Sequence, residues 1–303
     1  QLISLDDKYE PELTRDNINK LIKRDDLFGL FGFVGTPTVK NILPILDKIN
    51  IPFIAPFTGA SFLRNTSKKN FVNFRSSYEE EIDKIVGYLN EKKDIKKFAV
   101  FYQNDNYGEE GYISLIESLK KRNLKLHGEG MYKRNTLSIK HAFTEIKEER
   151  PEAIIMVGAY RANALFIKKA KENKTLKDVI FCNVSFSDAN EMIKLLDFDT
   201  KNILFSQVVP SYNDYTIDVI KEYKYLMKKY FPRETHGFIS LESFLVAKTI
   251  TAALSRVEGI LTRDKFLVSL KNIPSDTLKG IELKYKNTQL LNKVYLFEYI
   301  DSK

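Results

Sequence analysis

The sequence predicts an α/β fold with parallel sheets, and three observations lead to this expectation. Short apolar runs alternate with segments of helical periodicity as far as about Val209, which is typical of βαβ units. Some runs, such as residues 27–34, are almost continuously apolar, as strands buried on both faces of a sheet are. Small and polar residues follow the runs directly, at the positions where open α/β sheets bind ligands.

The order of the expected elements follows from this alternation. Strands are expected at residues 2–5, 27–34, 52–55, 71–74, 97–102, 125–132, 153–157, 179–182 and 203–208. Helices are expected at residues 11–23, 36–49, 78–90, 109–121, 138–148, 162–172 and 189–196. The second helix opens with Thr36 and Pro37, a start signal because proline needs no N–H group in the first turn.

The pattern changes after Val209. Two long amphipathic helices are expected at 217–230 and 241–255, and a shorter one at 263–270. The tail at 281–300 is expected to form two strands joined as a hairpin around residues 286–288. The first and middle thirds of the chain each hold one α/β set, which suggests two similar lobes.

Length and composition limit the class of protein. The 303 residues fit about two domains of ordinary size. Basic residues (48) are mixed with acidic ones (40), and no basic face is interleaved with aromatics, so we expect no nucleic-acid partner. A single cysteine, Cys182, excludes a disulfide framework and a cysteine-based zinc cluster. No uninterrupted apolar run approaches the roughly 18 residues of a membrane helix.

Two strand ends in the first third carry residues suited to an anion. They are Thr36 and Thr38 after the apolar run at 27–34, and Phe57, Thr58 and Gly59 after the run at 52–55. A helix start offers unpaired N–H groups and a positive dipole end, and the second strand end adds a hydroxyl and an aromatic wall. The alternatives are an ordinary helix cap by Thr36 and a plain turn at residues 55–60.

Three strand ends in the middle third carry amides, hydroxyls and aromatics. The residues expected to face a ligand there are Tyr107, Ala159, Tyr160 and Ser185. The alternative for the strand end before Tyr107 is that Asp105 or Asn106 simply caps the helix that follows. A calcium loop is a poor match because the spaced carboxylates of an EF-hand are missing.

The sequence contains no arrangement that indicates catalysis. His127, His141 and His236 are scattered, and the first two are expected at the surface. Cys182 has no histidine near it and is expected to be a buried structural thiol. HExxH, G-x-S-x-G, P-loop and dinucleotide motifs do not occur. Binding without a cofactor or metal is therefore favoured over catalysis.

Several segments resemble the leucine/isoleucine/valine-binding-protein family, the type I periplasmic receptors of ABC importers. They are FGLFGFVGTPTVKNILPILDKINIPFIAPFTGASFLR (28–64), FYQNDNYGEEG (101–111) and AIIMVGAYRANALFIKKAKE (153–172), with LDDKYEPELTRDNINKLI (5–22) similar to that family's second strand and helix. The resemblance covers nearly the whole chain, and the order and spacing of the segments are more specific than any one of them.

This resemblance implies two Rossmann-like lobes joined by three crossover strands, with the ligand in the cleft between them. Lobe 1 would comprise residues 1–76 and 209–283, and lobe 2 residues 77–208 and 284–303. The family's amino-acid ligands would be gripped by Thr36, Thr38, Phe57, Thr58 and Gly59, with Tyr107, Ala159 or Tyr160, and Phe238 as further contacts.

Two departures from the family pattern matter. The acid that usually meets a ligand's ammonium group falls at Ser185, so Asp188 or another acid reaches in, or the ligand is not a simple α-amino acid. The family also opens with a strand and helix that precede Gln1 here. Without this βα unit we expect a strand-sized gap with unpaired backbone groups, and hence an incomplete or cleaved chain.

The function favoured by these features is that of an extracytoplasmic solute receptor. It would close around a small organic ligand, expected to bear a carboxylate, and deliver it to the permease of an ABC importer. The location would be periplasmic or extracellular. One alternative is the ligand-sensing ectodomain of a membrane signalling protein, which would continue into a membrane helix. The other is an enzyme on a similar scaffold, which would need a titratable pair in the cleft.

Overall fold

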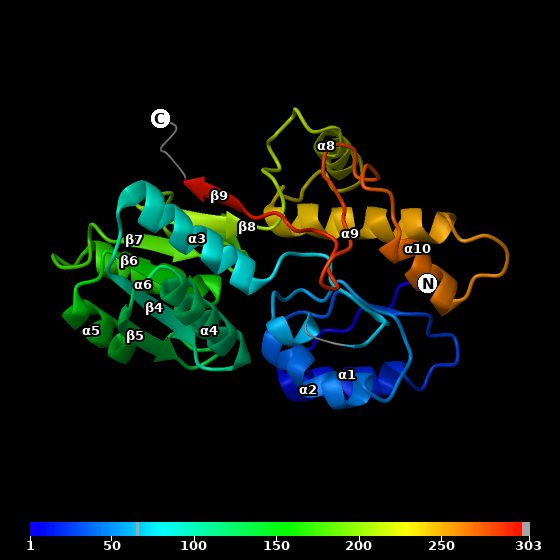
Figure 1. Ribbon diagram of the computed structural model, residues 1–303, viewed down its shortest axis with the longest axis horizontal. Coiled ribbons are helices and arrows are strands. Elements are labelled where there is room, and N and C mark those ends of the chain that lie inside the picture. Colours follow the sequence, from blue (N-terminus) through cyan, green and yellow to red (C-terminus); the bar gives the residue numbers. More distant parts are fainter. Residues whose placement is uncertain (65–66, 299–303) are drawn as a thin grey trace. The chain divides into compact units, whose positions relative to one another are not determined.

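The computed structural model describes residues 1–64 and 67–298, and the chain falls into two compact units (Figure 1). Unit 1 comprises Gln1–Ser76, Ser211–His236 and Ser240–Asn292. Unit 2 comprises Ser77–Pro210, Gly237–Ile239 and the chain from Lys293 onward. Residues 284–292 thus belong to unit 1 and not, as expected, with the second lobe. The reason is that the N–H groups of Leu290 and Leu291 donate to the carbonyls of Asn73 and Phe74, at 3.1 and 2.8 Å.

Unit 2 is built on a sheet of six strands in the order β5-β4-β6-β7-β8-β9. The strands are β4 (Phe98–Gln103), β5 (Leu126–Tyr132), β6 (Ala153–Val157), β7 (Ile180–Asn183), β8 (Ile203–Gln207) and β9 (Tyr295–Glu298). Neighbours are parallel except β8 and β9, which are antiparallel. The expected parallel α/β pattern of this part of the chain is therefore confirmed.

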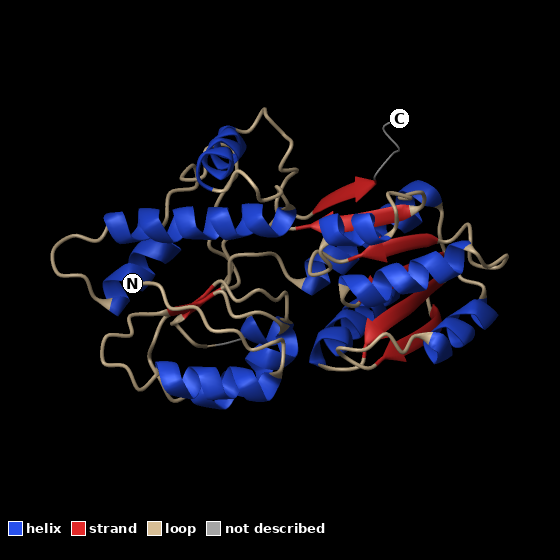
Figure 2. Cartoon of the chain, turned by 180° about the vertical axis from the view of Figure 1, so that it is seen from behind, coloured by secondary structure: helices blue, strands red, loops and turns tan. Residues whose placement is uncertain are grey.

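Helices cover both faces of this sheet (Figure 2). They are α3 (Tyr78–Lys93), α4 (Asn106–Lys121), α5 (Lys140–Glu149), α6 (Tyr160–Lys171) and α7 (Ala189–Leu195). Side chains alternate along each strand, so Val100 of β4 packs in the core beneath α3 and α4 while Phe101 points to the opposite face. On that face the Phe101 ring lies 4.6 Å from the ring of Phe166 in α6, measured between centroids.

Unit 1 has a smaller parallel sheet, in the order β1-β2-β3. The elements are α1 (Pro11–Leu21), β1 (Leu30–Phe31), α2 (Thr36–Leu46), β2 (Phe53–Ile54), the 3-10 turn η1 (Ser61–Leu63), β3 (Phe71–Val72), α8 (Asp218–Tyr230), α9 (Phe238–Ser255) and α10 (Arg263–Lys271). Ile18 of α1 and Val39 and Ile42 of α2 pack against Leu30 and Phe53 to form its core. Helices α1 and α2 lie on one side of the strands, and α9 and α10 on the other (Figure 1).

Two strand predictions were wrong. Residues 2–5 form no strand, because no backbone hydrogen bond joins them to another part of the described chain. The tail hairpin is reduced to one bridge between Lys286 and Gln289, and β9 pairs with β8 instead. The three strands expected at 27–34, 52–55 and 71–74 are present but only two residues long each.

Helix α9 alone, among the described residues, is long and apolar enough to cross a membrane when judged by length and composition. Two charged residues interrupt its apolar surface, Glu242 and Lys248. Glu242 is buried and paired with Arg75 within unit 1, and Lys248 bonds to Glu222 of α8 at 2.7 Å. These pairings are those of a helix that packs against its own protein.

An ion pair joins α3 to α4 in unit 2, and it leads to a prediction about pH. The Arg122 guanidinium and the Ser118 hydroxyl donate to Asp83 at 2.7 and 2.8 Å. The Arg122 hydrogen bond holds the pKa of Asp83 below its usual range. A lowered folded-state pKa stabilises the protein above the ordinary aspartate pKa of about 3.9, and this contribution is lost as the pH falls through the folded-state value.

We therefore expect Asp83→Asn to lower the free energy of unfolding at about pH 7, and the difference from wild type to shrink towards about pH 3. Urea unfolding followed by circular dichroism would measure it. Asp94→Asn, which removes an exposed pair with Lys96, is the matched control and should have little effect at either pH. A loss at Asp83 that is the same at both pH values would contradict the expectation.

Candidate functional site

Helix α2 begins just after β1, and its first residue is one of the expected ligand contacts. Gly35 precedes the helix with a φ of 100°, which favours glycine, and a Cβ at this position would lie 2.2 Å from the ring of Tyr9. Gly35 is thus the residue at the cap position, and Thr36 is the first helical residue rather than the cap. The Thr36 hydroxyl instead lies 2.7 Å from the hydroxyl of Thr58, and both residues are buried.

Several backbone N–H groups at this point have no acceptor among the residues that the structure describes. The Thr38 hydroxyl donates to the carbonyls of Val34 and Gly35, so it is used by the chain itself. By contrast, within the described residues the N–H groups of Thr36, Thr38 and Gly59 donate no hydrogen bond, although all three residues are buried. Buried N–H groups in native proteins are almost always paired. This makes the start of α2 and the adjoining turn a candidate anion site.

A buried ion pair lies beside this site, and sequence reasoning missed it. Arg75 donates to both carboxylate oxygens of Glu242 at 3.0 Å each, and the two side chains are only 1% and 7% exposed. Its guanidinium stacks 4.1 Å from the ring centroid of Phe57. An arginine directly after an apolar run was the available signal, but its partner lies 167 residues further along the chain. The pair neutralises the charge and fixes the Phe57 ring in place.

In unit 2 a buried carboxylate joins α3 to the ends of two strands. Glu81 accepts hydrogen bonds from the N–H and hydroxyl of Ser185, both at 2.8 Å, and from the hydroxyl of Ser206 at 2.6 Å. The sequence left two alternatives for Ser185: Asp188 or another acid meets the ligand's ammonium group, or the ligand is not a simple α-amino acid. In the structure Asp188 caps α7, and Glu81 is the acid that contacts Ser185. No local sequence pattern could indicate this contact, because Glu81 lies 104 residues before Ser185.

The ends of β4, β5 and β6 are linked by a chain of hydrogen bonds. The Ala159 N–H donates to the Tyr132 hydroxyl at 2.7 Å, which donates to the Gln103 side chain at 3.1 Å, which in turn donates to Asp105 at 2.7 Å. Asp105 also caps α4, as one of the alternatives held. Burial raises its pKa, and the hydrogen bond from Gln103 opposes this shift. The Ala159 N–H is therefore already occupied by a phenol of the same unit.

The three aromatic candidates in unit 2 have different surroundings. Tyr107 lies in the core, where its ring centroid is 5.3 Å from that of Tyr78 and 4.7 Å from that of Phe186. Tyr160 is half-buried at the start of α6, and Phe238 is buried at the start of α9. Tyr107 thus contributes to packing within unit 2, whatever further contact it makes.

The titratable residues considered for catalysis are placed as the sequence indicated. His127 and His141 are exposed. Cys182 is fully buried, and burial raises the pKa of its thiol, which keeps it protonated and unreactive. The expectations of two surface histidines and one structural thiol are confirmed.

With this geometry in place, comparison with known proteins identifies the family. The whole sequence, residues 1–303, matches a family model described as "Periplasmic binding protein". The chain belongs to this family. The expected likeness to the leucine/isoleucine/valine-binding type and the type I periplasmic binding protein fold are confirmed. No curated protein matches the sequence.

Solved structures support this assignment. A possible leucine/isoleucine/valine-binding protein from Rhodopirellula baltica is 30% identical, with a TM-score of 0.91 over 98% of this chain and 81% of that one. A branched-chain amino acid ABC transporter protein from Thermus thermophilus with bound valine is 14% identical, with a TM-score of 0.82 over 97% and 81%. A fatty acid ABC transporter substrate-binding protein from Thermomonospora curvata is 15% identical, with a TM-score of 0.86 over 97% and 76%. The names of these proteins refer to chemically different solutes, so the fold does not identify the ligand.

The network around Glu81 makes a prediction about stability. We expect Glu81→Ala to lower the free energy of unfolding by about 3 kcal/mol or more, because three buried donors lose their acceptor. Glu81→Gln should cost only about 1 kcal/mol, because the amide oxygen can still accept from the Ser185 N–H while the serine hydroxyls rotate.

Urea unfolding followed by circular dichroism would compare these variants with Glu79→Ala. Glu79 lies two residues away, is exposed and makes only a surface pair with Lys121, so its removal should change stability by less than about 0.5 kcal/mol. Equal losses in Glu81→Ala and Glu79→Ala would contradict the assigned role of Glu81.

Proposed function

We propose that this periplasmic binding protein is a periplasmic or extracellular receptor that binds a small, carboxylate-bearing organic solute without changing it. The observation that carries the proposal is the start of α2, where buried N–H groups of Thr36 and Thr38 lie with the hydroxyls of Thr36 and Thr58. Helix N-termini bind anions because their N–H groups lack partners within the helix and the helix dipole is positive there.

The chemistry of these donors favours a carboxylate. They are neutral hydroxyl and amide groups, and the nearby Arg75 is already paired with Glu242. A hydrogen bond to a charged group contributes about 1.5–3 kcal/mol, so a few such bonds supply ordinary receptor affinity. Delivery to the membrane permease of an ABC importer follows from the family as part of the proposal.

The same proposal holds that the protein keeps its bound solute chemically unchanged. The candidate residues of unit 1 are threonines, a glycine and a phenylalanine, and none of these is a general acid or base near neutral pH. The expected result is that mass spectrometry recovers any bound solute unchanged after prolonged incubation with the protein. A chemically altered solute would show an enzyme instead.

The surroundings of Ser185 predict which acids bind. Glu81 is buried and already accepts three hydrogen bonds from Ser185 and Ser206, so an ammonium group at Ser185 would have to compete with these donors for the carboxylate. Burying an ammonium group without an anionic partner costs several kcal/mol. We therefore expect acids without an amino group to raise the melting temperature more than the matched amino acids do.

A thermal-shift panel would test this with leucine against 4-methylpentanoate and valine against 3-methylbutanoate, together with aromatic acids and purines. Each aliphatic pair differs only in the amino group, so the comparison isolates the ammonium. A strong shift with leucine or valine alone would overturn the prediction.

The threonine pair predicts a loss of affinity. We expect Thr36→Val and Thr58→Val each to weaken binding of the best acid from that panel by roughly tenfold, because one hydroxyl donates to the other and either variant breaks the pair that presents the remaining O–H to a charged group. Isothermal titration calorimetry would measure the dissociation constants. Thr251→Val, an exposed position on α9, is the matched control and should bind like wild type. Unchanged affinity in both threonine variants would remove the proposed anion site.

A further inference from the structure

The buried ion pair of unit 1 places one positive and one negative charge beside the candidate anion site. The guanidinium of Arg75 is bound through two nitrogens to the carboxylate of Glu242, and its central carbon lies 4.1 Å from the centroid of the Phe57 ring. Phe57 belongs to the site through its backbone, because its carbonyl accepts from the N–H of Gly35, the cap residue of α2, at 3.1 Å. Thr58 follows it directly.

The positive charge of this pair is permanent. A guanidinium group does not lose its proton in a folded protein, so Arg75 stays charged whatever its partner does. Its side chain is only 1% exposed, and buried charges are screened by water and salt far less than surface charges are. The carboxylate of Glu242 therefore decides how much net positive charge an anion at the start of α2 meets.

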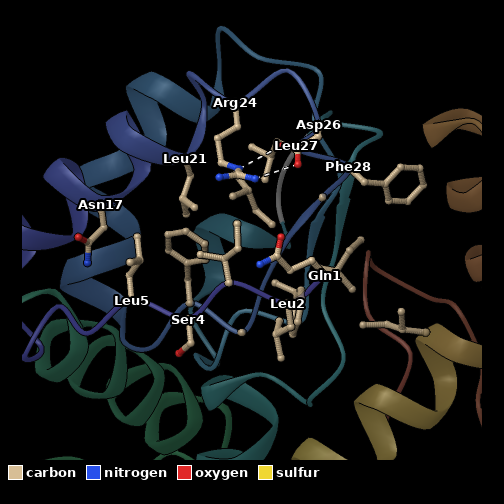
Figure 3. Close-up of a pocket in the computed structure, with 18 of the residues that line it drawn as sticks. Gln1, Leu2, Ser4, Leu5, Asn17, Leu21, Arg24, Asp26, Leu27 and Phe28 are labelled. Carbon is tan, nitrogen blue, oxygen red and sulfur yellow. Dashed lines mark hydrogen bonds and ion pairs between the residues drawn. The ribbon is translucent and has the colours of Figure 1, made fainter.

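A second pair in unit 1 has the same geometry in a different environment. Arg24 donates to both carboxylate oxygens of Asp26, at 2.9 and 2.8 Å, at the margin of a pocket beside β1 (Figure 3). These side chains are 42% and 69% exposed, and neither Phe57 nor Thr58 lines that pocket. Charges that are solvated in this way act only weakly over a distance. Arg24 and Asp26 thus supply a matched pair without influence on the anion site.

We propose that Glu242 determines the charge selectivity of the anion site: it neutralises Arg75, so that the site takes a monocarboxylate in preference to a dianion of the same shape. This inference rests on the proposed function and names the substrate class more narrowly. The donors of the site are the hydroxyls of Thr36 and Thr58 and the N–H groups at the start of α2, whose dipole is equivalent to roughly half a positive charge. A second negative charge on the ligand would be buried there without a cation.

Charge neutralisation and simple support of the Phe57 ring have different consequences. If Glu242 only held Arg75 and Phe57 in position, its loss would change the binding of all ligands of one shape by the same factor. A charge acts on a dianion about twice as strongly as on a monoanion. With an effective dielectric constant of about 20 and a distance on the order of 10 Å, one uncompensated charge strengthens binding of a monoanion roughly tenfold and of a dianion roughly a hundredfold.

The test compares 4-methylpentanoate with 2-methylpentanedioate, in which a second carboxylate replaces one methyl group. Isothermal titration calorimetry is done near neutral pH, where every carboxyl group of both ligands is ionised. Wild type is expected to bind the monocarboxylate at least roughly tenfold more tightly, because the second charge has no cation to meet. Equal affinities, or tighter binding of the dicarboxylate, would overturn the inference.

Glu242→Gln leaves the charge of Arg75 uncompensated and retains an amide oxygen that can accept from it. The preference for the monocarboxylate is expected to fall by roughly tenfold in this variant. Asp26→Asn removes the acid of the exposed pair, changes the net charge of the protein by the same amount and should keep the wild-type preference. An unchanged preference in Glu242→Gln, or an equal fall in both variants, would contradict the role of Glu242.

A double variant separates the charge of Arg75 from the substitution itself. Arg75→Gln combined with Glu242→Gln leaves no unpaired charge buried, so it is expected to fold even where Glu242→Gln alone does not, as circular dichroism would show. It should restore the wild-type preference, although the loss of the guanidinium over Phe57 lowers the affinity for both ligands. A double variant that differs from wild type in preference would overturn the inference.

The same titrations distinguish the failure of this inference from the failure of the proposed function. If wild type binds no carboxylate, the proposed anion site is wrong and the inference falls with it. If wild type binds 4-methylpentanoate and the Glu242→Gln variant keeps the same selectivity, the anion site stands and the inference alone is overturned.

Discussion

Parallel sheets bring the carboxyl ends of their strands to one edge, and the polar groups that collect there have to be hydrogen-bonded. The candidate site depends on how each unit meets this constraint. In unit 2 the chain meets it internally, through Glu81 at the ends of β7 and β8 and through the linked side chains of Gln103 and Tyr132. In unit 1 the N–H groups of Thr36 and Thr38 have no such partner among the described residues. This contrast is why we propose the anion site in unit 1.

Whether a buried charged group has hydrogen-bond partners within the protein also distinguishes charges that stabilise the fold from charges that are available to a ligand. Arg75 and Glu242 are buried but satisfy each other in a two-pronged pair, and removing either would leave a buried charge. Glu81 is a buried carboxylate held by neutral donors near the start of α3, where the helix dipole favours a negative charge. Both arrangements stabilise their own unit.

Local patterns predicted most elements of unit 2 well and those of unit 1 less well. The strand expected at 153–157 is found as Ala153–Val157, because its continuous apolar run is buried between helices on both faces. The run at 27–34 yields only Leu30–Phe31, because a strand extends as far as its partners do and β1 has a partner on one edge alone. Residues 2–5 have a strand-like sequence but pair with no other segment of the described chain. An apolar run indicates that a strand can form there, and backbone pairing with a neighbouring strand decides whether it does.

The sequence by itself determined the α/β class, the positions of most helices and the family to which the chain belongs, and it narrowed the cap of α4 to Asp105 or Asn106, because these depend on local spacing and on segments that are contiguous. It also predicted Thr36 and Thr58 as residues of the proposed anion site, since both follow expected strands, and the structure brings their hydroxyls to 2.7 Å from each other. Only the tertiary structure decided that Ser185 is bound to Glu81, that Arg75 is paired with Glu242, and that residues 284–292 belong with unit 1. These contacts join residues far apart in the chain, and local pattern contains no information about which distant partner a buried polar group will find.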